Sequence, residues 1–275
     1  MRCLRQLVWI AIVTLVLVGL SATAIATSHK LVLTGSSTIA PLAVELGRRF
    51  ESLHPSVRVD VQTGGSSRGI SDTRKGITDI GMVSRAMKSD EQDLQAFTIA
   101  LDGVGIIVHA SNPITNLTRQ QIIDIYTGKI TNWQEVGGKD ARITVVNKAE
   151  GRSTLELFLS HFELKNSAIK PHIVIGDNQQ GIKTVTGNPH AIGYVSIGAA
   201  EYDAQHNMPI KLLPLDGIVA SVASVRNGTY PLSRELNLVT RKTPKELTKQ
   251  FIKFARTEQV HDLVEAQYFV PISID

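Results

Sequence analysis

The sequence predicts an α/β fold in which strands and helices alternate along the chain. Three strand-like runs, at 31–33, 57–61 and 143–146, are each followed by a turn rich in Gly, Ser and Thr. After two of these turns, apolar residues recur at helical spacing. A chain of 275 residues with 43% hydrophobic and 20% charged residues is long enough for one or two domains with buried cores. We therefore expect α/β architecture with mostly parallel sheets.

The three units follow in chain order. In the first, a helix with apolar residues at 42, 46, 50 and 53 is ended by His54-Pro55. In the second, Val57, Val59 and Val61 alternate as a strand before a turn at 63–69. In the third, a turn at 150–154 precedes a helix with apolar residues at 155, 158, 159 and 162. Runs at 105–109, 173–175 and 192–195 predict further strands.

Capping signals place the later helices. Thr118 with Gln121 forms a capping box, and Thr243 before Pro244 predicts a cap with proline at the first helical position. Residues 247–255 and 260–264 show two amphipathic segments, and the polar residues 240–243 predict a loop before them. Asp102, among glycines, is expected to be a turn residue between domains.

The first residues have the pattern of a secretory signal peptide. Arg2 and Arg5 precede an apolar run at 7–20, and Ala24-Ile25-Ala26 offers small residues for cleavage. The run is shorter than the about 20 residues of a membrane span, although an uncleaved anchor is the alternative. We expect residues 1–26 to be removed, which leaves 249 residues with a net charge of +2 in place of +4.

Composition excludes several classes of function. Cys3, the only cysteine, lies before the apolar run, so it cannot be the lipidated first residue of a mature lipoprotein. Without it no disulfide or thiolate zinc site is possible. The charge forms no basic tail or stripe of the kind that nucleic-acid binding needs. Histidine spacing predicts no metal site, and no phosphate-binding loop or dinucleotide fingerprint predicts a cofactor.

The three turns predict an anion site. A helix start leaves backbone N–H groups free and carries partial positive charge, so hydroxylated residues there provide donors for an oxyanion. Any single turn is explained equally by helix capping, but three at strand ends of an α/β fold converge on the usual ligand position. Arg85 follows Ser84 after a strand-like run, and Lys148 and Arg152 bracket the third turn. These cations would strengthen oxyanion binding.

The second turn also matches a competing motif. Gly65-Ser66-Ser67-Arg68-Gly69 fits G-x-S-x-G, the nucleophile elbow of α/β-hydrolases, and it lies between a strand and a helix as that motif requires. A serine hydrolase using Ser67 is therefore the alternative from a different class. The Asp and His residues that follow, however, have no distinctive local context.

As an ordered set, several segments resemble the periplasmic phosphate-binding proteins, the PstS-like solute receptors of ABC importers. The resemblance covers essentially the whole chain after the signal peptide. It is carried by LTGSSTIAPL (33–42), GGSSRGI (64–70), DIGMVSRAM (79–87), YTGKITNWQEVGG (126–138), NKAEGRSTLELF (147–158), AIGYVSIG (191–198) and YPLSRELNLVT (230–240).

The resemblance implies a periplasmic-binding-protein-like fold of type II. Two α/β lobes would be joined by two crossover strands, with the oxyanion enclosed between the lobes. Lobe 1 would be discontinuous, comprising residues 27–103 and 221–275, and lobe 2 would comprise residues 104–220.

The family's phosphate contacts can be placed on this sequence residue by residue. They fall on Thr38 and the N–H of Ile39, with Ser37 beside them, and on Ser66, Ser84, Lys148, Arg152, Ser153 and Thr154. Arg85, next to Ser84, is expected to add positive charge to the site. Lys148 stands where the family usually has Arg, and Arg152 replaces a small residue, so the cation has moved within this segment. Ser84 stands where well-known binders place an Asp that accepts the proton of hydrogen phosphate.

The function implied is a periplasmic receptor that is not an enzyme and needs no cofactor. It would capture inorganic phosphate, deliver it to an inner-membrane ABC permease, and act as a monomer that binds no nucleic acid. Because a carboxylate acceptor favours a protonated oxyanion, the departure at Ser84 leaves sulfate, arsenate and molybdate as alternative ligands. A phosphate-triggered signalling role is a further alternative.

Overall fold

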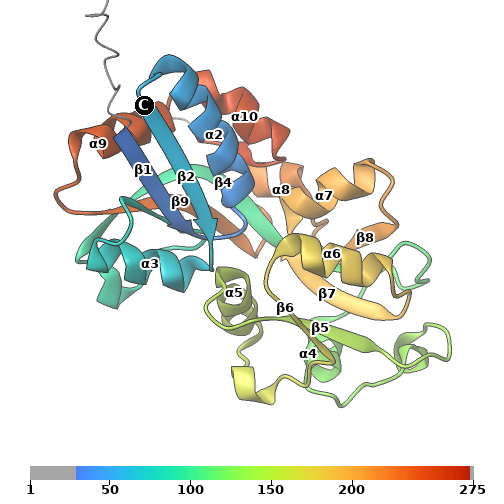
Figure 1. Ribbon diagram of the computed structural model, residues 1–275. Coiled ribbons are helices and arrows are strands. Elements are labelled where there is room, and N and C mark those ends of the chain that lie inside the picture. The colour runs from blue at the N-terminus through green and yellow to red at the C-terminus, as the bar shows by residue number, and fades with distance from the viewer. Residues whose placement is uncertain (1–28, 273–275) are drawn as a thin grey trace, which may run out of the picture.

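The computed structural model describes residues 29–272, which fold around a twisted sheet shared by two halves of the molecule (Figure 1). The strand order is β2-β1-β3-β9-β4-β7-β5-β6, and β8 and β10 both pair with β4. The strands are β1 (His29–Gly35), β2 (Val57–Thr63), β3 (Ile80–Val83), β4 (Leu94–His109), β5 (Thr144–Lys148), β6 (Ile173–Ile175), β7 (Ala191–Ser196), β8 (Ile210–Leu213), β9 (Ser233–Arg241) and β10 (Val270–Pro271).

Helices cover both faces of the sheet. The α-helices are α2 (Ala40–Leu53), α3 (Ser66–Lys75), α4 (Arg119–Tyr126), α5 (Ser153–Phe162), α6 (Asn178–Thr186), α7 (Ile197–Gln205), α8 (Val222–Arg226), α9 (Glu246–Phe254) and α10 (His261–Ala266). Short 3-10 helices are η1 (Ser89–Glu91), η2 (Trp133–Val136), η3 (Asn166–Ala168) and η4 (Glu258–Val260).

The first half is built on the parallel strands β2, β1 and β3. Apolar residues of α2, α9 and α10 pack on one face of these strands, and Ile70 of α3 packs on the other face with Val83 and Val239. Gly35 ends β1 with a φ of +133°, and a Cβ there would lie 2.3 Å from the carbonyl oxygen of Met82. Glycine is therefore required for β1 to pass so close to β3 before the turn into α2.

The second half repeats this arrangement with β7, β5 and β6, in which β5 runs parallel to both neighbours. Helices α4, α5 and α8 contribute to an aromatic core on one face, where Phe158 stacks on Tyr194 at 4.1 Å between ring centroids. Helices α6 and α7 cover the other face. Thr118 caps α4 through the capping box predicted from the sequence.

Strands β4 and β9 connect the two halves (Figure 1). β4 pairs with β9 from Leu94 to Gly103 and then with β7 from Val104 to Val108. Asp102 thus lies inside a continuous strand and is buried, so the prediction of a turn residue was wrong. The prediction relied on the neighbouring glycines, but these allow close packing of Ile197 and Leu212 against β4 and do not end the strand.

Three further expectations differ from the structure. β4 pairs antiparallel with β7, β8, β9 and β10, so the parallel strands are confined to the outer parts of each half. β9 continues to Arg241, and Thr240 is buried where a loop was predicted. α9 begins at Glu246 with Lys245 as its cap, two residues later than the predicted start with Thr243 as cap.

The division into two lobes stays a proposal. Buried apolar residues before Val104 and after Ser233 form one large core and a small second cluster, except that Val270 packs in the core of the other half, and those from 104 to 215 share other cores. Val225, Tyr230 and Leu232 pack with the second group, which favours a boundary near Ser233 over the expected residue 221. The predicted signal peptide, residues 1–26, lies outside the described residues.

Candidate functional site: a buried polar cluster between the lobes

Five helices, α2, α3, α5, α6 and α7, each follow a strand and place their first residues where the two halves meet. Helix N-termini provide free N–H groups and partial positive charge at this junction. The polar residues gathered there with those of β3, β4, β5 and β9 are 7% exposed or less. We call this set the interlobe cluster: Ser36, Thr38, Ser66, Ser84, Asp102, Lys148, Ser153, Thr154, Asn178, Ser196 and Arg234.

Arg234 of β9 and Asp102 of β4 form the central ion pair of the cluster. Their side chains are 0% and 1% exposed. Oδ2 of Asp102 accepts hydrogen bonds from Nε and Nη2 of Arg234 at 3.1 and 2.8 Å. Oδ1 accepts from the hydroxyl of Ser196 at 3.0 Å and from the N–H of Gly198 at 3.2 Å. The guanidinium is thereby fixed in orientation, and both carboxylate oxygens are occupied.

The other side of the Arg234 guanidinium contacts hydroxyl groups from both halves. Nη1 donates to Oγ1 of Thr154 at 3.0 Å, and Nη2 donates to Oγ1 of Thr38 at 3.2 Å. Oγ of Ser84 lies 3.5 Å from Nη1. Hydroxyl groups can rotate and donate to an anion as well as accept, so this side of the guanidinium is suited to an oxyanion.

Lys148, at the end of β5, adds a second buried cation. Its Nζ donates to Oδ1 of Asn178 at 3.1 Å, and Nδ2 of Asn178 donates to Thr38 across the lobe interface at 3.2 Å. Burial, followed by the positive charge of Arg234, lowers the pKa of Lys148 to about 7; Asp177 opposes this shift, and Arg152 adds a smaller lowering effect. A bound anion would favour the charged form of this lysine.

Serine hydroxyls complete the cluster. Ser36 donates to Ser84 at 2.9 Å and accepts from the N–H of Thr38 at 3.2 Å. Ser66 accepts from the N–H of Ser84 at 3.2 Å. The hydroxyl of Ser153 is buried and has no hydrogen-bond partner within residues 29–272. A buried donor without a partner is costly, so this hydroxyl marks a position where a ligand oxygen would be favourable.

The charges of the cluster favour an anionic ligand. Two buried cations, Arg234 and Lys148, face one buried carboxylate, Asp102. An uncompensated buried charge costs several kcal/mol unless it is paired and hydrogen-bonded. A small tetrahedral oxyanion supplies the missing negative charge and accepts bonds from the surrounding hydroxyl and N–H groups at the same time.

A second polar contact joins the lobes beside the cluster. Glu156 of α5 lies 2.9 Å from Nε of Arg85 and 2.8 Å from Nζ of Lys88, and it accepts from the hydroxyl of Ser67 at 3.2 Å. The N–H of Ser67 also donates to the carbonyl of Gly151 at 3.3 Å. We call Glu156, Arg85, Lys88 and Ser67 the Glu156 latch. These contacts describe a closed arrangement of the two lobes.

A cavity of about 670 Å³ lies against the cluster at the lobe interface. Its wall includes Thr38 and Val44 from one half and Asn178 and Tyr202 from the other. It reaches the cluster at Thr38 and Asn178, which are hydrogen-bonded to each other. Separation of these two residues would open the cluster to this cavity.

The structure brings six of the residues expected from the sequence into the cluster: Thr38, Ser66, Ser84, Lys148, Ser153 and Thr154. Ser37 lines the neighbouring cavity instead. The N–H of Ile39, the cap residue of α2, lies 3.4 Å from the hydroxyl of Ser36. Contact of these residues with a ligand stays a prediction.

The two other expected cations lie outside the cluster. Nη1 and Nη2 of Arg85 donate to Glu91 at 2.8 and 2.7 Å, and its Nε pairs with Glu156. Arg85 therefore offers no free charge to a ligand, against the expectation from the sequence. Arg152 is half-buried at the start of α5, and no hydrogen bond or ion pair holds its guanidinium within the described chain. Its effect on Lys148 indicates that its charge acts on the cluster.

The structure adds five cluster residues that the sequence analysis did not assign: Ser36, Asp102, Asn178, Ser196 and Arg234. Asn178 and Ser196 lie at strand-to-helix turns of the kind already recognised, so the same signal predicts them. Arg234 lies within the segment 230–240 that carried the family resemblance. Its pairing with Asp102 joins residues 132 positions apart and has no local signal.

The hydrolase alternative receives no support from the contacts of Ser67. Its hydroxyl donates to the carboxylate of Glu156, and within residues 29–272 no histidine is hydrogen-bonded to it. A nucleophilic serine needs a base, usually an imidazole, to take its proton. Over the same residues there is no group of three His, Cys, Asp or Glu side chains arranged for a metal ion, and no helix has the length and apolar character to cross a membrane.

Known proteins resemble this chain in sequence. It is 26% identical over 251 residues to the phosphate-binding protein PstS of Bacillus subtilis, which covers 90% of this chain and 82% of that protein. It is 28% identical over 250 residues to the phosphate-binding protein PstS of Borreliella burgdorferi, covering 86% and 88% of the two chains.

Solved structures share the fold. A putative phosphate ABC transporter substrate-binding protein from Clostridium perfringens, with bound phosphate, has a TM-score of 0.82 and 32% identity and covers 89% of this chain and 100% of that one. An ABC-type phosphate transport receptor from Vibrio cholerae has a TM-score of 0.74 and 32% identity over 88% of this chain and 100% of that one. The family model described as the PBP superfamily domain matches residues 21–258, and the chain belongs to this superfamily.

Proposed function

We propose that the protein captures inorganic phosphate in the interlobe cluster and delivers it to an inner-membrane ABC permease. The observation that carries this proposal is the Arg234 guanidinium, which is fixed by Asp102 and faces hydroxyl groups of Thr38 and Thr154 from opposite lobes. An anion at this point would contact both lobes and so couple its binding to their closure. The phosphate-binding relatives give the proposal independent support.

Binding follows from the chemistry of the cluster. Arg234 and Lys148 supply positive charge, while the hydroxyls of Thr38, Ser153 and Thr154 supply donors at helix starts. Ser66 and Ser84 extend the set from the first lobe. Release requires the Glu156 latch and the Thr38 to Asn178 contact to break, which opens the cluster to the adjoining cavity.

In this proposal the protein is a receptor without catalytic activity. No step of bond breaking is assigned to the cluster, because its residues neutralise and orient an anion. The receptor acts as a monomer in the periplasm, with no cofactor and no nucleic-acid partner. It reaches that compartment through cleavage of the predicted signal peptide, residues 1–26, and carries no lipid because Cys3 leaves with the signal.

A second candidate ligand is another tetrahedral oxyanion, such as sulfate, arsenate or molybdate. One observation favours it: both oxygens of Asp102 are occupied by Arg234, Ser196 and Gly198, so this carboxylate is not free to accept a proton from hydrogen phosphate. Selection of phosphate over a fully ionised dianion then depends on the hydroxyl of Ser84 as acceptor.

Thermal unfolding of the phosphate-stripped mature protein with each anion tests the proposal. A ligand at 1,000 times its Kd stabilises the folded state by about 4 kcal/mol. We expect phosphate to give a saturable shift, and Arg234→Met to lose it. A shift with sulfate or molybdate but none with phosphate would favour the second candidate. No shift with any of the anions would refute the proposed function.

A further inference from the structure

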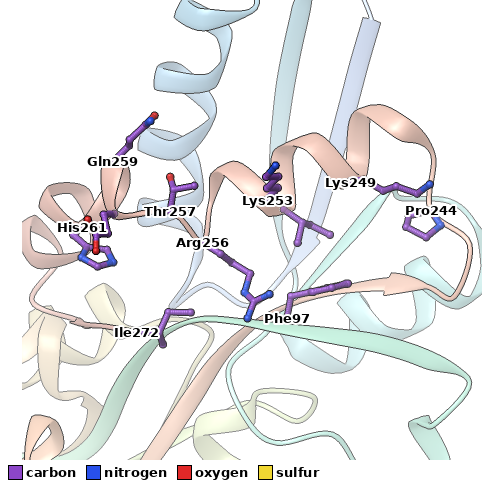
Figure 2. Close-up of a pocket in the computed structure, with 11 residues that line it drawn as sticks. Phe97, Pro244, Lys249, Lys253, Arg256, Thr257, Gln259, His261 and Ile272 are labelled. Carbon is purple, nitrogen blue, oxygen red and sulfur yellow. The ribbon is translucent and has the colours of Figure 1, made fainter. Parts of the chain in front are cut away.

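A groove on the outside of the first lobe lies apart from the interlobe cluster (Figure 2). It has a volume of about 750 Å³ and runs along α9 to η4 and the start of α10. We call it the α9 groove and define it by Phe97, Lys249, Ile252, Lys253, Arg256 and Ile272. Nothing in the proposed phosphate-binding function uses these residues.

The rim of the α9 groove carries three cations, Lys249, Lys253 and Arg256, against one carboxylate, Glu258. Lys249 and Lys253 lie four residues apart on α9 and so share one side of the helix, and Arg256 lines the same groove from the turn that follows it. The segment 241–261 holds six Lys or Arg and two Asp or Glu residues, while the whole chain holds 29 and 25. The remaining residues are therefore balanced at 23 of each, and this segment carries the whole formal net charge of +4.

The rim cations are poorly neutralised. Lys249 lies 3.6 Å from Glu246 with both side chains more than half exposed, which is a weak pair. Lys253 has no ion pair within the described chain. Arg256 is placed by its Nε, which donates to the carbonyl of Thr98 at 3.3 Å, and its guanidinium carbon lies 6.0 Å from the ring centre of Phe97. Its terminal nitrogens have no partner among residues 29–272.

The floor of the groove is apolar and recessed. Ile252 is 4% exposed, and Phe97 and Ile272 are half-buried beside it. Figure 2 shows Phe97 and Ile272 below the helix that carries the lysines. A flat anionic membrane would contact the lysines but could not reach such a floor, whereas a single apolar side chain of a peptide could. The charge and the shape together favour a peptide.

We propose that the α9 groove is a docking site for an acidic protein segment that carries an apolar side chain. Carboxylates of the segment would pair with Lys249, Lys253 and Arg256, and its apolar side chain would lie on Phe97 and Ile272. The site is separate from the phosphate cluster, so a partner can bind whether or not the cluster is occupied. Recognition by charge and one apolar anchor is typical of transient peptide interfaces.

Fluorescence anisotropy with a synthetic peptide tests this proposal. The probe is a labelled nine-residue peptide with a central leucine between four glutamates on each side. We expect saturable binding that weakens in high salt, as charge pairing requires. Replacement of the leucine by glutamine should weaken binding about fivefold or more, since the apolar surface that leucine would bury in the groove is then lost. Equal binding of the two peptides would overturn the anchored site.

Variants locate the binding. Lys249→Glu combined with Lys253→Glu should reduce peptide affinity at least about tenfold, and Phe97→Ala should remove the preference for leucine. Lys165→Glu, an exposed charge reversal in the other lobe, is the matched control and should bind the peptide as the parent does. Unchanged phosphate binding shows that each variant is folded.

Three outcomes would contradict the docking site. The first is peptide binding that survives the double charge reversal. The second is binding of vesicles containing phosphatidylglycerol without binding of the peptide, which would indicate a membrane contact. The third is self-association in sedimentation that the double variant abolishes, which would indicate that a second copy of the chain occupies the groove.

Discussion

Glu156→Gln tests the link between lobe closure and ligand affinity. The substitution keeps the size of the side chain and removes the charge that joins α5 to Arg85, Lys88 and Ser67 of the other lobe. Arg85 keeps its two hydrogen bonds to Glu91, so the first lobe should remain folded. The variant therefore changes the closed arrangement selectively.

The structure sets the size of the effect. Lys88 is 49% exposed, and a pair of this kind contributes about 0–1 kcal/mol. Arg85 is 6% exposed, and its Nε lies 2.9 Å from Oε2 of Glu156 as an ion pair without hydrogen-bond geometry, so this pair contributes about 1 kcal/mol. Because glutamine keeps one acceptor oxygen, we expect a loss of about 1–2 kcal/mol from the closed state. If closure accompanies binding, the Kd for phosphate rises about 5- to 30-fold.

Isothermal titration with phosphate measures this change. Glu163→Gln is the matched control, because Glu163 lies just beyond the end of the same helix, is 87% exposed and contacts Arg119 at 3.4 Å within the described chain. We expect the control to bind as the parent does. A Glu156→Gln variant that is folded and binds phosphate within twofold of the parent would refute the claim that the latch stabilises the bound state.

The remaining predictions concern the cluster and its closure. At pH 8.5, phosphate binding should take up a proton and should be weaker than at pH 7. Lys148, with its pKa of about 7, is mostly neutral in the free protein at pH 8.5, and the bound anion restores its charge. Calorimetry in buffers of different ionisation heat should show the proton uptake in the parent but not in Lys148→Met. In the anion-free protein, the free energy of unfolding should rise by up to about 1.4 kcal/mol for each pH unit between pH 7 and the unfolded pKa near 10.5. Over that window Lys148 has lost its proton in the folded state, whereas the unfolded lysine keeps it. Asp102→Asn leaves a buried guanidinium without its carboxylate, so denaturant unfolding should show a loss of about 3–5 kcal/mol without anion and a smaller loss with saturating phosphate; equal losses would argue against an anion beside that guanidinium. Gly65→Ala places a Cβ 2.5 Å from the carbonyl oxygen of Gly151 in the other lobe and should weaken phosphate binding about tenfold. In the control Gly137→Ala, φ is similarly positive but the Cβ meets open space, so this variant should be less stable and still bind phosphate as the parent does. Similar phosphate affinities in the two variants would contradict the closed packing.

The sequence predicted those parts of the site that depend on local chain geometry. Thr38, Ser66 and Ser153 each lie at a strand-to-helix turn, and the residue types that favour such turns also provide donors for an anion. The alternation of strands and helices followed from the spacing of apolar residues. These features require information from only about ten neighbouring residues.

The features that the sequence did not predict depend on long-range pairing. Asp102 and Arg234 meet only because β4 and β9 run antiparallel between the lobes. Arg85 was expected to bind the ligand, but Glu91 and Glu156 neutralise it, and Glu156 comes from the opposite lobe. In the same way, Thr240 is buried because β9 pairs with β4 at this position, although the local sequence is polar.

A crystal structure of the mature protein soaked with arsenate, which has the shape and charge of phosphate and an anomalous signal, tests the central claim most directly. The account predicts one strong anomalous peak in the interlobe cluster, within hydrogen-bonding distance of the Arg234 guanidinium and the hydroxyls of Thr38 and Thr154. A peak at any other position, with these three residues bonded only to one another, would contradict it.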